Sequence, residues 1–181
     1  MSYVCVYHSS NPLQPVKLLN HEEDIASVLA EIGVGFERLQ ADKPVTEHST
    51  DTEVKAAYQQ EIEQVSQAAG YTAIDVFNIG EQEPDKEQIR AELLQEHWHN
   101  EDEACFFVAG RGLLNLHVQE QVFAVFCERG DLVTVPAQMR RWFDIGEQPR
   151  VAFIRMFKSP AGRHMHYSGS DVARQYTLLT D

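Results

Sequence analysis

Hydrophobic and polar positions repeat with a helical period in three segments of the first half of the chain. Residues 22–32 carry apolar side chains three and four positions apart, which is typical of an amphipathic helix. Residues 50–70 begin with a capping-box sequence and keep a single apolar stripe up to a closing glycine. Residues 84–96 open with Pro-Asp and repeat the same spacing. We therefore expect three helices before residue 97.

Short apolar runs typical of β-strands dominate the second half. Glycine-containing turn signals at 110–112 and 130–131 separate them. Closely spaced short strands predict a sandwich or closed barrel. The predicted strands are residues 35–39, 72–79, 104–109, 113–118, 122–127, 131–135 and 151–157.

Length and composition indicate one domain. The chain has 181 residues, of which 43% are hydrophobic, enough for one core and too few for two comfortable ones. We divide the domain into a mixed α/β part at 1–95, a barrel core at 96–160 and a tail at 161–181. The expected class is mainly β with added helices.

Charge and cysteine content exclude several kinds of partner. The net charge is −13 and no Lys/Arg cluster occurs, which argues against nucleic-acid binding. No apolar run reaches the ~20 residues of a membrane span, and residues 1–4 lack the start of a secretory signal. The three cysteines, Cys5, Cys105 and Cys127, are expected to be free thiols. These features favour a cytoplasmic monomer that binds neither nucleic acid nor membrane.

A compact candidate metal site follows the third predicted helix. His97 and His99 are two positions apart, so on a strand both side chains leave the same face, and Glu103 follows four residues later. Two imidazoles and one carboxylate on one side of an ion suit non-haem Fe(II), and Ni, Mn or Zn would also fit. The spacing therefore predicts a transition-metal site.

The residues around this site resemble the signatures of the cupin superfamily of small β-barrels. Six residues separate Glu103 from Gly110, which matches the first cupin signature. The second signature, G-x(5)-P-x-G-x(2)-H, begins at Gly130 but is then broken, since Gln138 replaces its glycine and Arg141 its histidine. The resemblance implies a cupin-type barrel, a double-stranded β-helix or jelly roll.

Several longer blocks resemble one cupin family, the bacterial acireductone dioxygenases of methionine salvage. The resemblance implies oxidation of the enediol 1,2-dihydroxy-3-keto-5-methylthiopentene by O2, with one Fe(II) or Ni(II) per chain. The Fe form would give formate and 2-keto-4-methylthiobutyrate, and the Ni form a CO-releasing product set. The blocks lie at residues 19–26, 33–38, 96–103, 106–113, 142–146 and 154–157.

The family's metal ligands fall on His97, His99 and Glu103, and its fourth ligand falls on Arg141. Arginine has no lone pair to offer, so Arg141 cannot replace an imidazole as a ligand. His164 or His166, in a second H-x-H sequence, are possible substitutes, although a solvated loop is the simpler interpretation.

The family's substrate residues are only partly retained. The resemblance assigns one pocket arginine to Arg155, which would stabilise developing negative charge, and a pocket aromatic to Phe143. A second family arginine falls on Cys105, expected to be a small buried residue, and two pocket aromatics fall on Leu93 and Arg163. Arg141 could then restore the positive charge lost at Cys105.

Three alternatives remain open on the sequence. The same scaffold could serve a different enediol or keto substrate, because the replaced residues cluster in the pocket. It could be a catalytically silent cupin that binds a small anion or a protein partner. A zinc or manganese isomerase is the third. Glu101 and Asp102 could orient the imidazoles from outside the site, whereas His117 is expected to be a core histidine.

Overall fold

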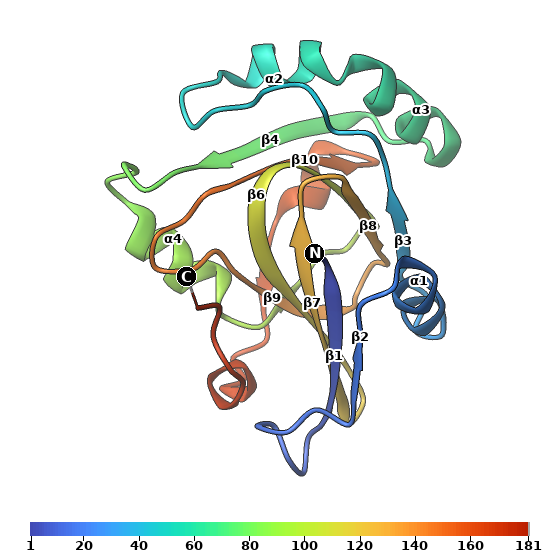
Figure 1. Ribbon diagram of the computed structural model, residues 1–181, viewed down its shortest axis with the longest axis vertical. Helices are drawn as coiled ribbons and strands as arrows, with labels where there is room; N and C mark the ends of the chain where they lie inside the picture. Colours follow the sequence, from blue (N-terminus) through green and yellow to red (C-terminus); the bar gives the residue numbers. More distant parts are fainter. Residues whose placement is uncertain (181) are drawn as a thin grey trace.

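A computed structural model describes residues 1–180, which form a bent β-sheet barrel with helices packed outside it (Figure 1). The helices are α1 (Glu22–Ala30), α2 (Asp51–Ala57), α3 (Gln59–Ala69) and α4 (Lys86–Leu93), with short 3-10 turns η1 (Pro160–Arg163) and η2 (Val172–Gln175). The strands are β1 (Tyr3–His8), β2 (Lys17–Leu19), β3 (Gly35–Arg38), β4 (Ala73–Ile79), β5 (His97–Trp98), β6 (Glu103–Val118), β7 (Gln121–Glu128), β8 (Asp131–Val135), β9 (Arg140–Asp144), β10 (Val151–Phe157) and β11 (His166–Tyr167).

Strand β6 joins the two halves of the barrel. Its first residues pair with β8 and β10, and its later residues pair with β7 and β9, all antiparallel. Glu103, Cys105 and Phe107 face the barrel interior, whereas Ala104 and Phe106 face a second core outside it. This alternation follows from the two-residue period of a strand, and it carries Glu103 into the barrel.

The first half of the chain also contributes to the barrel. β1 pairs with β7, β3 with β8 and β4 with β10. The barrel strands are therefore not confined to residues 96–160. β1, β2, β5, β9 and β11 are absent from the strands predicted from sequence.

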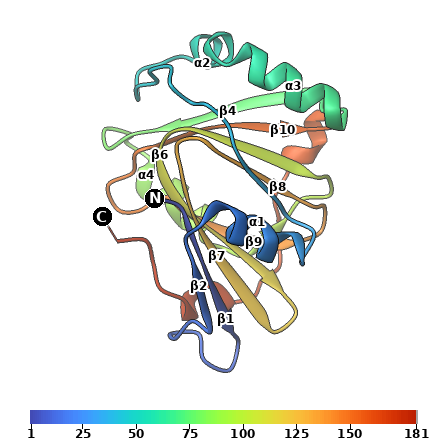
Figure 2. The ribbon, with the colours of Figure 1, turned by 45° about the vertical axis from the view of Figure 1, so that its right-hand side comes forward.

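Helices cover the outside of the barrel rather than entering it. In Figure 1, α2 and α3 lie over β4, and Figure 2 shows α1 beside the strands at the other side. The predicted helix at 50–70 is broken at Tyr58, which takes a non-helical φ of −116° between α2 and α3. The reason is that Tyr58 is fully buried, stacks edge-on against Phe106 and donates its hydroxyl to the Lys43 carbonyl. Tertiary packing here overrides helix continuity.

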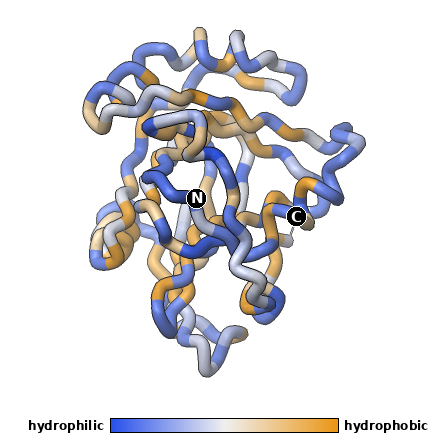
Figure 3. Tube along the Cα trace, turned by 180° about the vertical axis from the view of Figure 1, so that it is seen from behind, coloured by the Kyte–Doolittle hydropathy of each residue, from blue (hydrophilic) through white to orange (hydrophobic). Residues whose placement is uncertain are grey.

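Polar and apolar residues are distributed unevenly along the chain. Figure 3 shows apolar stretches concentrated along the strands and polar stretches at the outer turns. Among residues 1–180, no helix is both long and apolar enough to cross a membrane.

The predicted turn at residues 110–112 is wrong, because β6 runs through it without interruption. Gly110 has a φ of +65° just after the β6–β10 register shift at Val108, and the strand bends there instead of reversing. Two features require glycine at this position. The positive φ is unfavourable for other residues, and an added Cβ would lie 1.7 Å from the Arg150 carbonyl oxygen. A single long strand can therefore serve both sides of the barrel.

Gly110→Ala is expected to lower the free energy of unfolding by about 2–5 kcal/mol, from backbone strain plus steric overlap. Gly33→Ala is the matched control, because Gly33 also has a positive φ but no atom within 4 Å of an added Cβ. It should cost about 1–2 kcal/mol from strain alone. Urea denaturation measures the free energy of unfolding of both variants. Equal decreases would contradict a contribution from steric overlap with Arg150.

Candidate functional site

The predicted metal-site residues meet at a small hollow inside the barrel. His97 lies on β5, His99 just after it, Glu103 at the start of β6, and Arg141 on β9, directly opposite His97 in the strand pairing. The hollow has a volume of about 40 Å³, and all four side chains line it. Each of the four residues is at most 6% exposed. The fold therefore brings together residues from three strands in a site shielded from water.

The two imidazoles are oriented by main-chain oxygens. His97 Nδ1 lies 2.8 Å from the Gln95 carbonyl oxygen, and His99 Nδ1 lies 2.8 Å from that of Gly162. A carbonyl only accepts, so each Nδ1 carries the proton and each Nε2 keeps its lone pair. This is the arrangement in which proteins hold histidine ligands.

Both imidazoles are held neutral. The pKa of His97 is lowered to about 4, mainly by burial and in part by the nearby Arg141 charge, against the effect of the Gln95 carbonyl. Burial also lowers the pKa of His99. Two neutral imidazoles in a buried hollow are suited to accept hydrogen bonds.

Arg141 fills the side of the hollow where a fourth ligand would lie. Its Nε donates to the Met139 carbonyl and its Nη2 to the Pro136 carbonyl, both at 3.1 Å. Its Nη1 donates to Glu103 Oε1, also at 3.1 Å. Every nitrogen of this guanidinium is thus engaged, and the side chain is only 2% exposed. Arg141 faces inward and is fixed in place.

Glu103 is the partner of this buried cation. Burial alone would raise the pKa of Glu103, but the Arg141 charge, with His99 and Arg155, outweighs it and holds the pKa below its usual value. Oε2 of Glu103 lies 3.9 Å from His99 Nε2 and 4.0 Å from Arg155 Nη1. The carboxylate is therefore charged and already neutralised by arginine.

These contacts decide whether the site fits a metal ion. The two Nε2 atoms are suitable donors, yet Glu103 is bound to Arg141 and the fourth corner holds a guanidinium. Among residues 1–180, no group of three His, Cys, Asp or Glu side chains is arranged to hold a metal ion. In this arrangement the residues do not fit a divalent cation.

Arg155 lines the same hollow from β10, paired across the sheet with Cys105. Its Nη2 lies 3.5 Å from Asp75, but its buried Nε has no hydrogen-bond partner within residues 1–180. Burial raises the pKa of the Cys105 thiol well above its usual value, so this thiol stays neutral. Arg155 thus presents an unused donor, in the way expected for a residue that awaits an anionic ligand.

Apolar side chains close the remainder of the hollow. Phe143 and Leu93, predicted from the family resemblance, lie on this wall, together with Phe153 and Met165. Sequence reasoning missed the last two, because an apolar residue in a strand or loop carries no signal of which cavity it lines.

Other predicted residues lie outside the hollow. His164 is exposed, and His166 Nε2 lies 3.0 Å from Asn100 Nδ2. Neither histidine lines the pocket. Arg163 is half-exposed and lies 3.3 Å from Asp75.

The acidic residues between His99 and Glu103 serve the backbone rather than the imidazoles. Glu101 accepts from the Ser159 main chain, and Asp102 accepts from the Ala137 main chain at 2.8 Å. His117 is not a core histidine, because it is partly exposed, and its Nδ1 lies 2.6 Å from the buried Glu96 carboxylate. Glu96, which sequence reasoning overlooked, accepts further bonds from Arg140 and Ser168.

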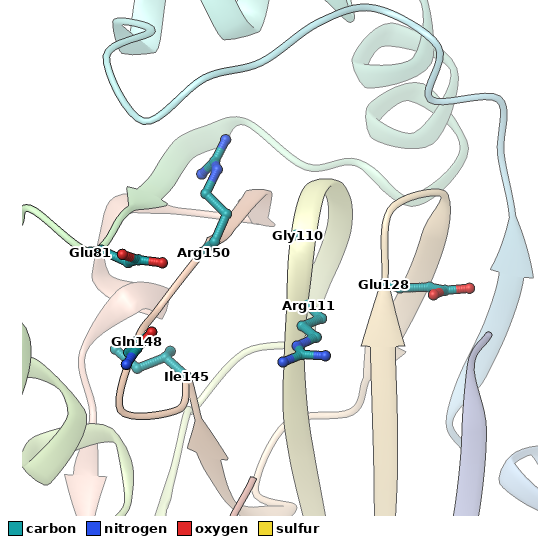
Figure 4. A pocket seen from close by; sticks show the side chains of 7 residues that line it. All are labelled: Glu81, Gly110, Arg111, Glu128, Ile145, Gln148 and Arg150. Atoms are coloured by element: carbon teal, nitrogen blue, oxygen red, sulfur yellow. The ribbon is translucent and has the colours of Figure 1, made fainter. Parts of the chain in front are cut away.

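Larger hollows lie elsewhere. One of about 610 Å³ is lined by Glu96, Tyr167 and residues of η2. Another, of about 420 Å³, lies beside the bend of β6 (Figure 4). In Figure 4 the side chains of Arg111 and Arg150 point in different directions, and Glu81 and Glu128 stand on opposite sides. Arg150 donates to the Val45 carbonyl at 2.8 Å and so has a structural role. The small hollow in the barrel remains the candidate functional site.

The barrel and its interior polar site define a cupin with a small-molecule pocket. The ARD/ARD' family model matches residues 6–164. Over the full length of both chains, the protein is 50% identical to the acireductone dioxygenase of Pseudomonas paraeruginosa and 49% identical to that of Pseudomonas aeruginosa. A solved structure, "Acireductone dioxygenase from Bacillus anthracis with cadmium ion in active center", aligns with a TM-score of 0.81 and 27% identity, covering 92% of this chain and 98% of that chain.

The chain belongs to the ARD/ARD' family, the acireductone dioxygenases. The predictions of a cupin fold and of an oxidoreductase of the dioxygenase class are confirmed by these matches. Members of the family hold a metal ion, as the cadmium-bound structure illustrates.

Proposed function

We propose that this chain oxidises an acireductone, 1,2-dihydroxy-3-keto-5-methylthiopentene, with O2 in methionine salvage. The observation that supports this most strongly is co-linear identity of about one half over the full length of two acireductone dioxygenases. The products would be formate and 2-keto-4-methylthiobutyrate, or the CO-releasing set of the nickel form.

The chain's own residues would prepare the substrate. The Nε2 atoms of His97 and His99 keep their lone pairs, so in the absence of an ion they can accept hydrogen bonds from the two enediol hydroxyls. Arg155 would stabilise the resulting negative charge through its unpartnered Nε–H. Phe143 and its apolar neighbours would hold the thioether. An enediolate held in this way is an electron-rich partner for O2.

The choice between Fe(II) and Ni(II) is part of the same proposal. Either ion would be held by His97, His99 and Glu103, and would supply the redox chemistry when bound. Because Glu103 is paired with Arg141 in this structure, Arg141 would first have to release that carboxylate.

Oxygen uptake with acireductone is the direct test. We expect the purified protein, prepared anaerobically with Fe(II), with Ni(II) or with chelator, to consume one O2 per substrate above the background rate in at least one preparation. His97→Gln should lower kcat/KM about 10²–10³-fold, because an imidazole that contacts the reacting enediol or the ion is lost. Formate and CO assays identify the product set. A background rate in all three preparations would refute the proposed reaction.

A second candidate is supported by the Arg141–Glu103 ion pair, which occupies the ligand set. It is a divergent cupin that acts on another enediol or keto acid, or that binds a small anion without turnover. Oxygen uptake measured with a set of other enediols and keto acids distinguishes a cupin that oxidises another substrate from one that oxidises acireductone. Anion binding without oxygen uptake would identify the second.

A further inference from the structure

We propose that the Arg141 guanidinium takes the place of the divalent cation in this site, so that the chain binds an enediolate or a 2-keto acid through guanidinium groups without a metal. The proposal rests on the proposed function only for the class of ligand. Its basis is the geometry of Arg141, Glu103 and Arg155.

The charge of Arg141 lies where a metal ion would be held. Arg141 is opposite His97 across paired strands, and it shares the 40 Å³ hollow with both imidazoles and Glu103. A cation therefore already lies among the side chains that would hold a metal. Its Nη1 is 3.1 Å from Glu103 Oε1, the distance of a charge-assisted hydrogen bond.

The guanidinium of Arg141 is also fixed in this position. Two main-chain carbonyls, those of Met139 and Pro136, accept from Arg141 in addition to Glu103. Swinging the guanidinium aside for a metal would break all three bonds within a buried site, and leave those acceptors to be satisfied anew. The β9 strand and the loop before it thus hold Arg141 as part of the site rather than as a mobile gate.

The balance of charge in the hollow favours one anion. Glu103 and Asp75 contribute −2, and the arginines paired with them, Arg141, Arg155 and Arg163, contribute +3, so these side chains carry a net +1. A divalent ion added beside Arg141 would raise the total to +3 in a low-dielectric interior, where like charges repel strongly.

A ligand in the hollow would meet several free donors. Arg155 Nε is buried without a partner within the described residues, and each Nη of Arg141 carries a second hydrogen beyond the one already donated. Two adjacent oxygens of a planar anion match such donors, as they would match two sites on a metal ion. The neutral Nε2 atoms can accept from a remaining hydroxyl, and the apolar wall would receive the rest of the molecule.

Metal titration of the wild-type protein is the first test, and it needs no variant. Isothermal titration calorimetry and elemental analysis of the purified chain with Ni(II), Fe(II) and Mn(II) should show well under one equivalent bound at the barrel site. Arg141→His, which restores an imidazole at this position, should bind Ni(II) about tenfold or more tightly than the wild type. One equivalent bound to the wild type and lost in His99→Gln would overturn the proposal.

Ligand binding without metal is the second test. The probe is 2-keto-4-methylthiobutyrate, which has adjacent keto and carboxylate oxygens and a thioether. In the presence of EDTA the wild type should bind the probe, and its Kd should stay within about twofold when Ni(II) replaces EDTA, whereas Arg141→His in EDTA should bind at least about tenfold more weakly. Arg111→Gln, which removes an equal charge outside the barrel, should bind as the wild type does. Probe binding that requires metal would overturn the proposal.

The two tests separate this proposal from the proposed reaction. Metal-independent probe binding without oxygen uptake would support the guanidinium site and refute the reaction on acireductone. Oxygen uptake that depends strictly on a metal bound at His97 and His99 would do the reverse. Thermal unfolding of each variant checks that loss of binding is not loss of fold.

Discussion

Glu103→Ala is expected to lower the free energy of unfolding by about 3–5 kcal/mol in the presence of EDTA, because it leaves Arg141 as an uncompensated buried cation. Arg141 is 2% exposed and Glu103 is its only carboxylate partner among the described residues. In a site built for a metal, removing a carboxylate from the metal-free protein would instead relieve an unpaired buried charge. The sign of the change therefore distinguishes an ion pair from an empty ligand set.

Urea denaturation followed by circular dichroism measures this change. The double variant Glu103→Leu with Arg141→Met removes both charges and keeps apolar volume, so it should recover most of the lost stability. Recovery would assign the loss to the unpaired charge rather than to a cavity. Unchanged or increased stability of Glu103→Ala would contradict the ion pair.

Arg155→Gln is expected to reduce kcat/KM for acireductone about 10²–10³-fold, the usual effect of removing a donor to developing negative charge. The Nε of Arg155 has no hydrogen-bond partner within residues 1–180, whereas its Nη2 lies 3.5 Å from Asp75. Cys105 lies opposite and cannot take over, because its buried thiol is neutral and a weak donor. The loss should therefore be larger in activity than in stability.

Arg163→Gln is the matched control for this variant. Arg163 approaches the same carboxylate as Arg155, at 3.3 Å from Asp75, but lies outside the hollow and is half-exposed. It should leave kcat/KM within about twofold, since an exposed ion pair contributes little. Equal losses in the two variants would assign the effect to Asp75 rather than to contact between Arg155 and the substrate.

The sequence predicts the fold class and which residues lie together in the hollow, but not the contacts that those residues make. The H-x-H spacing places His97 and His99 on one face, because a strand alternates its side chains. The sequence could not predict that Arg141 would bind Glu103, since that contact depends on the pairing of β9 with β5 and on two main-chain carbonyls of the preceding loop. Long-range pairing of this kind leaves no local pattern.

The missed strands have a similar physical explanation. β5 and β11 have only two residues each, too few for a periodic pattern to form. β9 carries Arg140 and Arg141 where a buried strand is expected to be apolar, although Arg141 lies inside the barrel. Gly110 predicts a turn from sequence because the same positive φ serves both a reversal and a bend.

The pairing of β1 with β7 and of β4 with β10 has a consequence for synthesis in the cell. β1 (Tyr3–His8) pairs on one side with the short strand β2, which follows directly, but its other partner, β7, begins only at Gln121. β4 pairs with β10, which begins only at Val151. During translation β1 and β4 therefore leave the ribosome long before β7 and β10 exist, and folding dominated by such distant pairings takes milliseconds to seconds. Nascent chains of this protein are therefore expected to depend on chaperones until β10 has emerged.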